Sequence, residues 1–485
     1  MKRRLLLFVT VLGFGMPSGV YAQSAMAGEE KWLVETLEKN MDPFADIAME
    51  IWKYAEVGYQ EYKSSKLLQD KLKADGFNVE TGVAGIPTAF VASYGSGSPV
   101  IAILGEFDAL PGVSQAAVPY REERPEVNAG HACGHHLFGS GSAAAASAVK
   151  QWMAKNNIRG TLRFYGTPAE EGGAGKVYMV REGLFADVDA VLHWHPGSSN
   201  SASASSSLAN KSAKFRFYGI ASHAAASPWN GRSALDGVEA MNYMINMMRE
   251  HVPSEARIHY VITKGGEAPN VVPAYAEVFY YVRHPDAPTV KNLFERVVKA
   301  AEGAAMGTGT KMEYEVIHGL YNLLPNETLA EMMYTNLNKV GGVAYTAEEK
   351  AFGEKIIASY EFTKADINTA SQIEPYEVIM TGQGGSTDVG DVSWVVPTAG
   401  MRAATWVPGT SAHSWQAVAA GGTGIGKKGM AVAAKTLALT AQDLFQNPAV
   451  MEKAKAELFE KRGAGADFMY EALLGDRKPP LDYRK

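Results

Sequence analysis

Apolar and polar positions repeat with different periods along the chain, and these periods predict its elements. Residues 29–73 carry apolar side chains at helical spacing, which indicates amphipathic helices. Further along, PTAFVASYG, PVIAILGEF, GTLRFYGTP and DAVLHWHP are predicted as strands, with the helices GSAAAASAVKQWMAKNN and GKVYMVREGLF between them. Strands that alternate with helices predict an α/β domain with a mixed, mostly parallel sheet.

The pattern changes after a small, polar stretch at residues 197–212, which we interpret as a linker or domain boundary. From there to residue 320 the periods predict a strand, a helix, two strands, a helix and a strand. That order is typical of a ferredoxin-like α+β sandwich. Helices return afterwards and include KKGMAVAAKTLALTAQDLF. We therefore expect one α/β domain, residues 23–208 and 321–485, interrupted by an inserted α+β domain at residues 209–320.

The first residues have a composition of their own. A basic MKRR is followed by a short apolar run at residues 5–16, and SGVYAQS then places Val20 and Ala22 at the −3 and −1 positions of a cleavage site. The run is shorter than the ~18 apolar residues of a membrane span, which disfavours a membrane anchor. We predict a signal peptide at residues 1–22 and a periplasmic or secreted chain, free of the membrane after cleavage.

Charge and cysteine content narrow the function further. With 46 Lys and Arg against 52 Asp and Glu, the net charge of −6 gives no electrostatic reason to expect nucleic acid as a partner. The only cysteine, Cys133, cannot form an internal disulfide in an exported chain. It is therefore a buried free thiol, a thiol exposed to oxidation, or a metal ligand.

The stretch NAGHACGHHLFGSG, residues 128–141, places three histidines around that cysteine. Other ligand-type side chains follow predicted strands or lie in glycine-rich loops, and open α/β sheets place their sites at the carboxyl ends of strands. A set of sulfur, nitrogen and oxygen donors suits Zn²⁺ or a similar divalent transition metal. The predicted members are Glu106 and Asp108 in GEFDALPG, Cys133 and His135, Glu170 and Glu171 in TPAEEGG, His193 and His195 in LHWHPG, and His413 in GTSAHSWQ.

Glu170 and Glu171 are neighbours, and neighbouring side chains diverge on an extended or turning backbone. One can ligate metal while the other takes a proton from metal-bound water and returns it to a leaving amine. A solvated acidic loop is the alternative, which Pro168, the following glycines and the other ligand-type clusters disfavour.

The stretch GGTGIGKK, residues 421–428, nearly fits a phosphate-binding loop. It lacks the Ser or Thr that would hold Mg²⁺, and no predicted strand leads into it. We expect a flexible loop before the last helix and no nucleotide site.

The motifs GHACGHH, PAEEGG, WHP, GIASHAA with GRSALDG, APNVVP and HSWQ jointly resemble the M20 metallopeptidases. Within them they resemble the amidohydrolase branch of hippurate and aminobenzoyl-glutamate hydrolases, from about residue 32 to residue 445. The resemblance implies a metal-dependent amidohydrolase that cleaves N-acyl amino acids, with p-aminobenzoyl-glutamate among the substrates. It also implies two divalent ions per chain, Zn²⁺ or Mn²⁺.

Position by position, the resemblance implies a role for each residue of the set. Cys133 takes the bridging place between the ions, and Glu170 takes the place of the general base. Asp108 buttresses the site. Glu106 stands where other branches carry a metal-binding histidine, and whether it binds metal stays open. The remaining ligands implied are His135, Glu171, His413 and one histidine of LHWHP, for which His195 is favoured over His193; His131 and His136 are structural.

In the inserted domain the resemblance implies a homodimer or higher homo-oligomer. His223 would reach the partner's active site to hold an oxyanion, while Asn270 and Arg283 would bind the substrate carboxylate. Two alternatives stay open at this point. One is a dipeptidase or carboxypeptidase with the same two-metal site, and the other is an exported solute-binding protein, which Glu170 beside a full ligand set disfavours. Whether a second, different chain is required also stays open.

Overall fold

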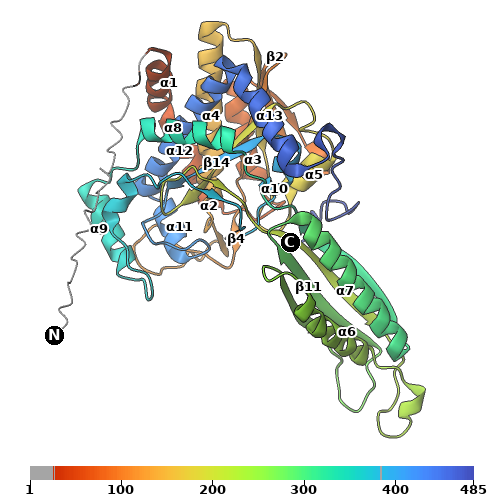
Figure 1. The fold of residues 1–485 in the computed structure, drawn as a ribbon. Coiled ribbons are helices and arrows are strands. Elements are labelled where there is room, and N and C mark those ends of the chain that lie inside the picture. The colour runs from red at the N-terminus through yellow and green to blue at the C-terminus, as the bar shows by residue number, and fades with distance from the viewer. Residues whose placement is uncertain (1–25, 27, 383–384, 485) are drawn as a thin grey trace, which may run out of the picture.

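The protein consists of an α/β body and a long unit that protrudes from it, as the computed structural model shows (Figure 1). The structure describes residues 26, 28–382 and 385–484, so the signal peptide predicted at residues 1–22 lies outside the described residues. Within this part of the chain, we find no helix with the length and apolar character needed to cross a bilayer.

A six-stranded sheet forms the centre of the body. Four neighbouring strands, β6, β3, β7 and β14, run parallel, and β2 and β1 continue the sheet antiparallel at one edge. Every residue of β3 is buried, as expected for a parallel strand covered on both faces. The predicted mixed, mostly parallel sheet is confirmed. In spatial order the strands are β1 (Asn78–Thr81), β2 (Phe90–Ser96), β6 (Gly160–Gly166), β3 (Val100–Gly105), β7 (Ala190–Gly197) and β14 (Thr398–Ala404).

Two long helices, α4 (His135–Asn156) and α12 (Gly424–Gln446), pack on each other and on β3 and β7. Small side chains let α4 approach the sheet closely, since a Cβ at Gly139 would lie 2.6 Å from the carbonyl oxygen of Glu106. The remaining helices of the body are α1 (Gly28–Lys39), α2 (Met41–Tyr54), α3 (Tyr62–Ala74), α5 (Gly175–Arg181), α8 (Glu327–Val340), α9 (Ala347–Ile357), α10 (Val389–Val395), α11 (Trp415–Gly421) and α13 (Pro448–Arg462).

The protruding unit is an antiparallel sheet with α6 (Ala234–Met248) and α7 (Ala287–Thr308) on one face (Figure 1). Its chain order, strand-helix-strand-strand-helix-strand, is compatible with the expected ferredoxin-like sandwich. Its first strand begins at Ala209 and its last strand ends at Leu320, while the domain bounds and the role in dimerisation stay predictions. In spatial order the strands are β10 (Arg257–Lys264), β11 (Tyr275–His284), β9 (Ala209–Tyr218) and β12 (Lys311–Leu320).

Two connecting segments contain more regular structure than the sequence predicted. The stretch interpreted as a linker or domain boundary, residues 197–212, includes the end of β7, the short strand β8 (Ala204–Ser205) that pairs with β13 (Val378–Ile379), and the start of β9, the first strand of the protruding unit. The expected flexible loop at residues 421–428 is mostly helix, and α12 is followed by α13. The Thr423 side chain accepts a hydrogen bond from the Ile425 amide, and this cap starts α12 early.

Candidate metal centre

A cavity of about 690 Å³ lies beside the carboxyl ends of the central strands. Side chains that follow β3, β6 and β14 line it, together with side chains within β7 and β14 and residues of the serine-rich segment between β7 and β9. The sheet therefore brings the predicted chemical groups to one place, as its topology requires. Among the lining residues are Glu106, Cys133, Glu170, Glu171, His193, His195, Arg402 and His413.

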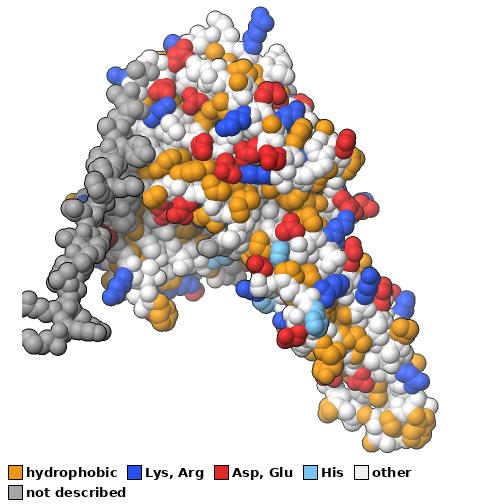
Figure 2. Space-filling model, in the orientation of Figure 1, with side chains coloured by type: hydrophobic (Ala, Val, Ile, Leu, Met, Phe, Trp, Pro, Cys, Tyr) orange, Lys and Arg blue, Asp and Glu red, His pale blue; other side chains and the backbone are white. Residues whose placement is uncertain are grey.

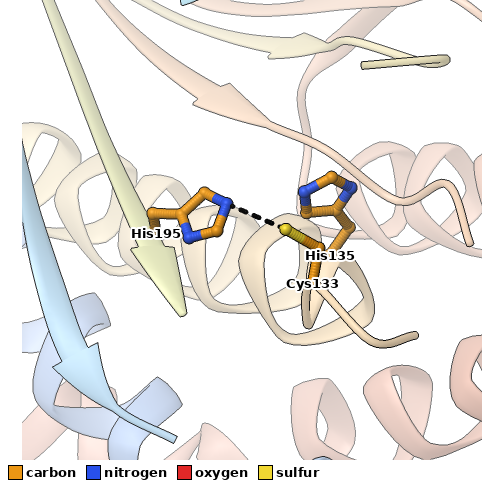
Figure 3. Close-up of side chains that lie close together, drawn as sticks. All are labelled: Cys133, His135 and His195. Carbon is orange, nitrogen blue, oxygen red and sulfur yellow. Dashed lines mark hydrogen bonds between the residues drawn. The ribbon is translucent and has the colours of Figure 1, made fainter. Parts of the chain in front are cut away.

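Cys133 lies two residues before the first residue of α4, and Figure 3 shows its sulfur facing the ring of His195. Its Sγ is 3.4 Å from His195 Nε2, and His195 Nδ1 is 2.7 Å from the Pro196 carbonyl oxygen. A carbonyl can only accept, so Nδ1 carries the proton and Nε2 turns a lone pair toward the sulfur. Burial raises the pKa of the Cys133 thiol, and a thiolate there needs a cation beside it.

His135 is held between two carboxylates at the first residue of α4. Its Nδ1 lies 2.8 Å from Asp108 Oδ1, and its Nε2 lies 3.0 Å from Glu106 Oε2. The other oxygen of Asp108 accepts a hydrogen bond of 2.8 Å from the Glu171 amide. Asp108 thus orients one predicted ligand and the backbone of another, which matches the buttressing place implied for it.

Glu171 and His413 lie side by side on the cavity wall, with Glu171 Oε1 3.4 Å from His413 Nε2. Donor atoms of these two residues and of Cys133 all lie within 4.8 Å of one another, and so do those of Cys133, His135 and His195. Two candidate ligand groups therefore share the single cysteine. A third group of the same size consists of Glu106, His135 and Glu170.

These residues fit divalent metal ions. Glu171 Oε1 and His135 Nε2 are buried and make no hydrogen bond within the described residues, although each lies near another ligand-type atom. Sulfur, imidazole nitrogen and carboxylate oxygen are the donors that Zn²⁺ and similar ions take in proteins. Each of the two groups that share Cys133 offers three donor atoms, which leaves room for water or substrate.

The two histidines of β7 differ in surroundings. His193 belongs to none of the candidate ligand groups of the described residues, and its Nε2 is buried against Gly400, without a hydrogen bond. Burial and then the positive charges of Lys176 and Arg402 lower the pKa of His193 to about 3. The geometry thus favours His195 as the ligand, as the sequence did.

The other two histidines of the stretch at residues 128–141 lie against backbone carbonyl groups. His131 Nε2 lies 3.1 Å from the Ile51 carbonyl oxygen, and His136 Nε2 lies 3.0 Å from that of Gly421. Burial lowers the pKa of His131 to about 3, so its ring is neutral. A structural role for both residues stays a prediction.

Lys176 is a member of the site that the sequence did not point to. Its Nζ lies 2.6 Å from Glu106 Oε1 and 2.6 Å from Asp388 Oδ1, and all three side chains are buried. Burial raises the pKa of Glu106, and the Lys176 charge opposes that shift. Glu106 is thus paired with a lysine on one oxygen and faces His135 with the other.

The predicted residues of the inserted unit lie apart from this cluster. His223 and Asn270 are exposed and adjacent, since the Ala224 amide donates to the Asn270 carbonyl at 3.0 Å. Arg283 packs over the Tyr281 ring. None of the three predicted residues lines the cavity, whereas Arg402, which sequence reasoning missed, does. Its position in β14, beside His195 of β7, is the signal that could have found it.

Ligand groups at the carboxyl ends of a parallel sheet, with a further carboxylate beside them, define the class of α/β metal-dependent hydrolases. The chain matches the peptidase family M20/M25/M40 over residues 102–439 and belongs to that family. It is therefore a hydrolase of amide bonds, and the solute-binding alternative is not supported.

Individual relatives agree with this family. The chain is 41% identical to one of the named subunits of p-aminobenzoyl-glutamate hydrolase from Escherichia coli, covering 88% of this chain and 94% of that protein. It is 30% identical to the Xaa-Arg dipeptidase of Mus musculus, covering 87% and 90%. A solved dinuclear metal-binding peptidase of family M20 from Bacillus subtilis shares the fold at a TM-score of 0.57 and 18% identity, covering 86% of this chain and 99% of that one.

Proposed function

We propose that the protein hydrolyses the amide bond of N-acyl amino acids, with p-aminobenzoyl-glutamate as a substrate, using two divalent ions, Zn²⁺ or Mn²⁺. The observation that carries the proposal is the pair of ligand groups that share Cys133 at the wall of the cavity. The relation to the E. coli protein of that name supports the substrate. The ligands would be Cys133, His135, Glu171, His195 and His413.

When bound, the ions polarise the substrate carbonyl and lower the pKa of water. The residues of the chain do the rest of the work. Glu170 lies on the cavity wall next to Glu171 but outside both groups that share Cys133, and it would take a proton from the attacking water and give it to the leaving amine. Asp108 fixes the ring of His135, so that its Nε2 faces the site.

Arg402 is our candidate for binding the carboxylate of the substrate. Among the described residues it is the only lysine or arginine that lines the cavity. Arg402 of β14 lies opposite His195 of β7, and burial and then the Arg402 charge lower the pKa of His195. Asn270 and Arg283, predicted for the same task, would need to come from a partner chain or from a closed arrangement.

A dipeptidase with the same centre is the second candidate function. Glu374 and Glu377 line the cavity and would suit a basic side chain, as the name of the mouse relative suggests. The test is turnover with added Mn²⁺ or Zn²⁺ of p-aminobenzoyl-glutamate, hippurate and dipeptides that end in arginine, with chelated enzyme as the control. Hydrolysis of the dipeptides alone would contradict the proposed substrate class. Turnover of none of them would contradict the function.

Arg402→Gln gives the specificity test. A charge-assisted hydrogen bond contributes about 1.5–3 kcal/mol, so KM should rise about 10–100-fold for substrates with a free carboxylate. Arg402→Lys should keep part of the affinity. An unchanged KM in Arg402→Gln would remove this residue from the substrate site.

We also propose that the protruding unit joins two copies of the chain. Apolar side chains gather on this unit, and those on the edge strand β10 and on α6 are well exposed (Figure 2). Exposed apolar edge strands are normally covered by a partner. In such a dimer His223 would act on the partner's site. The side chains concerned are Tyr260, Val261 and Ile262 on β10 and Tyr243 and Met247 on α6.

Mass measurement in solution tests the dimer, and a monomer at working concentrations would contradict it. The E. coli relative is named as one subunit of its hydrolase, and another named subunit of that enzyme is 25% identical to this chain. The same measurement with and without a chain of that second kind therefore shows whether a different protein binds this one, and turnover with and without it shows whether it is needed.

We further propose export to the periplasm or medium with cleavage after Ala22. N-terminal sequencing of the mature protein checks the cleavage site.

A further inference from the structure

The loop that carries Glu170 and Glu171 has a backbone that other parts of the chain must hold. Ala169 has φ +59° and Ala174 has φ +61°, although neither is glycine. A residue other than glycine in this left-handed region costs on the order of 1–3 kcal/mol and persists only where its surroundings fix it. Neighbouring groups must therefore constrain the backbone at Glu170 and Glu171, which line the cavity.

Part of the constraint comes from the segment between α2 and α3. The Glu61 carboxylate accepts a hydrogen bond of 2.9 Å from the Ala169 amide, and the Tyr59 hydroxyl donates one of 2.6 Å to the Gly173 carbonyl. Both side chains are completely buried. These bonds fix the two ends of the loop and leave Glu171, near its middle, to other groups.

The carbonyl of Glu171 is held by the last described residues of the chain. The Tyr483 hydroxyl donates to it at 3.0 Å, and Arg484 Nη2 donates at 2.7 Å. The Tyr483 ring also packs edge-on against Tyr59, with ring centroids 5.6 Å apart. Since the Glu171 amide donates to Asp108, both polar groups of this one backbone residue are satisfied by fixed partners.

The tail segment, residues 476–484, is itself anchored at several points on its way to the loop. The Arg477 side chain donates to the Ile317 carbonyl of β12 at 2.5 Å, and Arg181 donates to the Arg477 carbonyl at 2.8 Å. Closer to its end, Gln60 Nε2 donates to the Leu481 carbonyl at 2.7 Å. The tail segment therefore reaches Glu171 along a defined path.

From these contacts we infer that Tyr483 and Arg484 are positioning residues, which hold the backbone of Glu171 so that its carboxylate points at the metal centre. This inference rests on the proposed function of the site. The two side chains bind the Glu171 carbonyl, and neither of them lines the cavity. They would act through Glu171 and make no contact with the substrate.

The expected size of the effect follows from the role. Partners that orient metal ligands typically contribute 10–100-fold to metal affinity or activity. We therefore expect Tyr483→Phe with Arg484→Gln to weaken metal binding about 10–100-fold and to lower kcat when metal is limiting. Excess metal should restore kcat in large part, and KM for the substrate should stay unchanged.

The experiment compares four purified full-length variants with the wild type by metal titration against a chelating dye, kcat and KM at two metal concentrations, and thermal unfolding. They are Tyr483→Phe, Arg484→Gln, the double variant and Arg484→Lys. Asp482→Asn, at an exposed position between Leu481 and Tyr483, is the matched control and should behave as wild type. Arg484→Lys keeps a donor and should recover part of the affinity.

Equal metal affinity in the double variant, the control and the wild type would overturn the inference, whatever the unfolding temperature. A lower unfolding temperature alone would show a merely structural contact. If the double variant fails to fold, Tyr483→Phe decides, because it keeps the ring packing against Tyr59 and removes only one donor. A wild type that binds no metal would instead contradict the proposed function itself.

Discussion

Exchanging the neighbouring residues Glu170 and Glu171 for glutamine, one at a time, should affect the enzyme in two different ways. Glu171 shares a ligand group with Cys133 and His413, whereas Glu170 shares one with Glu106 and His135. Glu170→Gln should keep metal and fold and lose about 10²–10⁴-fold in kcat, the usual contribution of a general base. That loss corresponds to about 2.7–5.5 kcal/mol of transition-state stabilisation.

Glu171→Gln should instead lose metal, because an amide oxygen is neutral and a poorer ligand than the carboxylate that faces His413 at 3.4 Å. The assay is metal content per chain after gel filtration, followed by kcat with and without added metal. Added metal should restore part of the activity of Glu171→Gln and none of that of Glu170→Gln. If Glu170→Gln lost the metal and Glu171→Gln kept it, the two roles would be exchanged, and a Glu170→Gln enzyme near wild-type rate would refute the reasoning.

Three further outcomes test other parts of the structure. Lys176→Met removes the lysine charge from two buried carboxylates and should lower the free energy of unfolding by about 3–5 kcal/mol in denaturant titrations, whereas Lys53→Met, which breaks an exposed pair, should change it by under about 1 kcal/mol. Mixed dimers of His223→Ala with Glu170→Gln should recover activity that both parent homodimers lack, if His223 acts on the partner's site; no recovery in dimers confirmed by mass would refute this. Burial raises the pKa of Asp391 to about 7, so this carboxyl keeps its proton in the folded state at pH values where the unfolded chain has lost it. The stabilisation from this proton is complete below about pH 4 and is lost as the pH rises through 7. Stability curves should therefore show Asp391→Asn gaining on the wild type between these values by at most about 1.4 kcal/mol per pH unit, and parallel curves would contradict this.

The sequence was sufficient to predict site residues that lie next to a helix or strand with a clear hydrophobic period. Cys133 and His135 precede and begin a long helix, and the glutamate pair follows a buried strand, so the strand-end rule placed them together. The periods of the inserted segment also predicted its order of strands and helices. By contrast, β8 and β13 have two residues each and leave no period, and the segment around β8 was therefore taken for a linker.

Other members of the site depend on contacts that only the fold creates. Lys176 stands in the apolar helix sequence GKVYMVR, and Asp388, 212 positions later, is what makes it part of the centre. Tyr483 and Arg484 reach Glu171 across more than 300 positions. No local pattern carries such pairings, because they arise from packing of whole elements.

The many acidic groups of the candidate metal centre predict that metal binding and folding stability are linked in this chain. Buried ionised groups are costly unless they are paired. Among the described residues, Lys176 is the only lysine or arginine with a buried side chain. Divalent ions would supply the missing positive charge, and a ligand that binds only the folded state stabilises it by mass action. Chelation should therefore lower the unfolding temperature as well as activity, and both should return together when Zn²⁺ or Mn²⁺ is added back. Calorimetry that shows the same unfolding temperature with and without chelator, in a chain shown to lose its metal, would contradict this link. The acidic groups concerned are Glu106, Asp108, Glu170, Glu171, Asp388 and the thiol of Cys133.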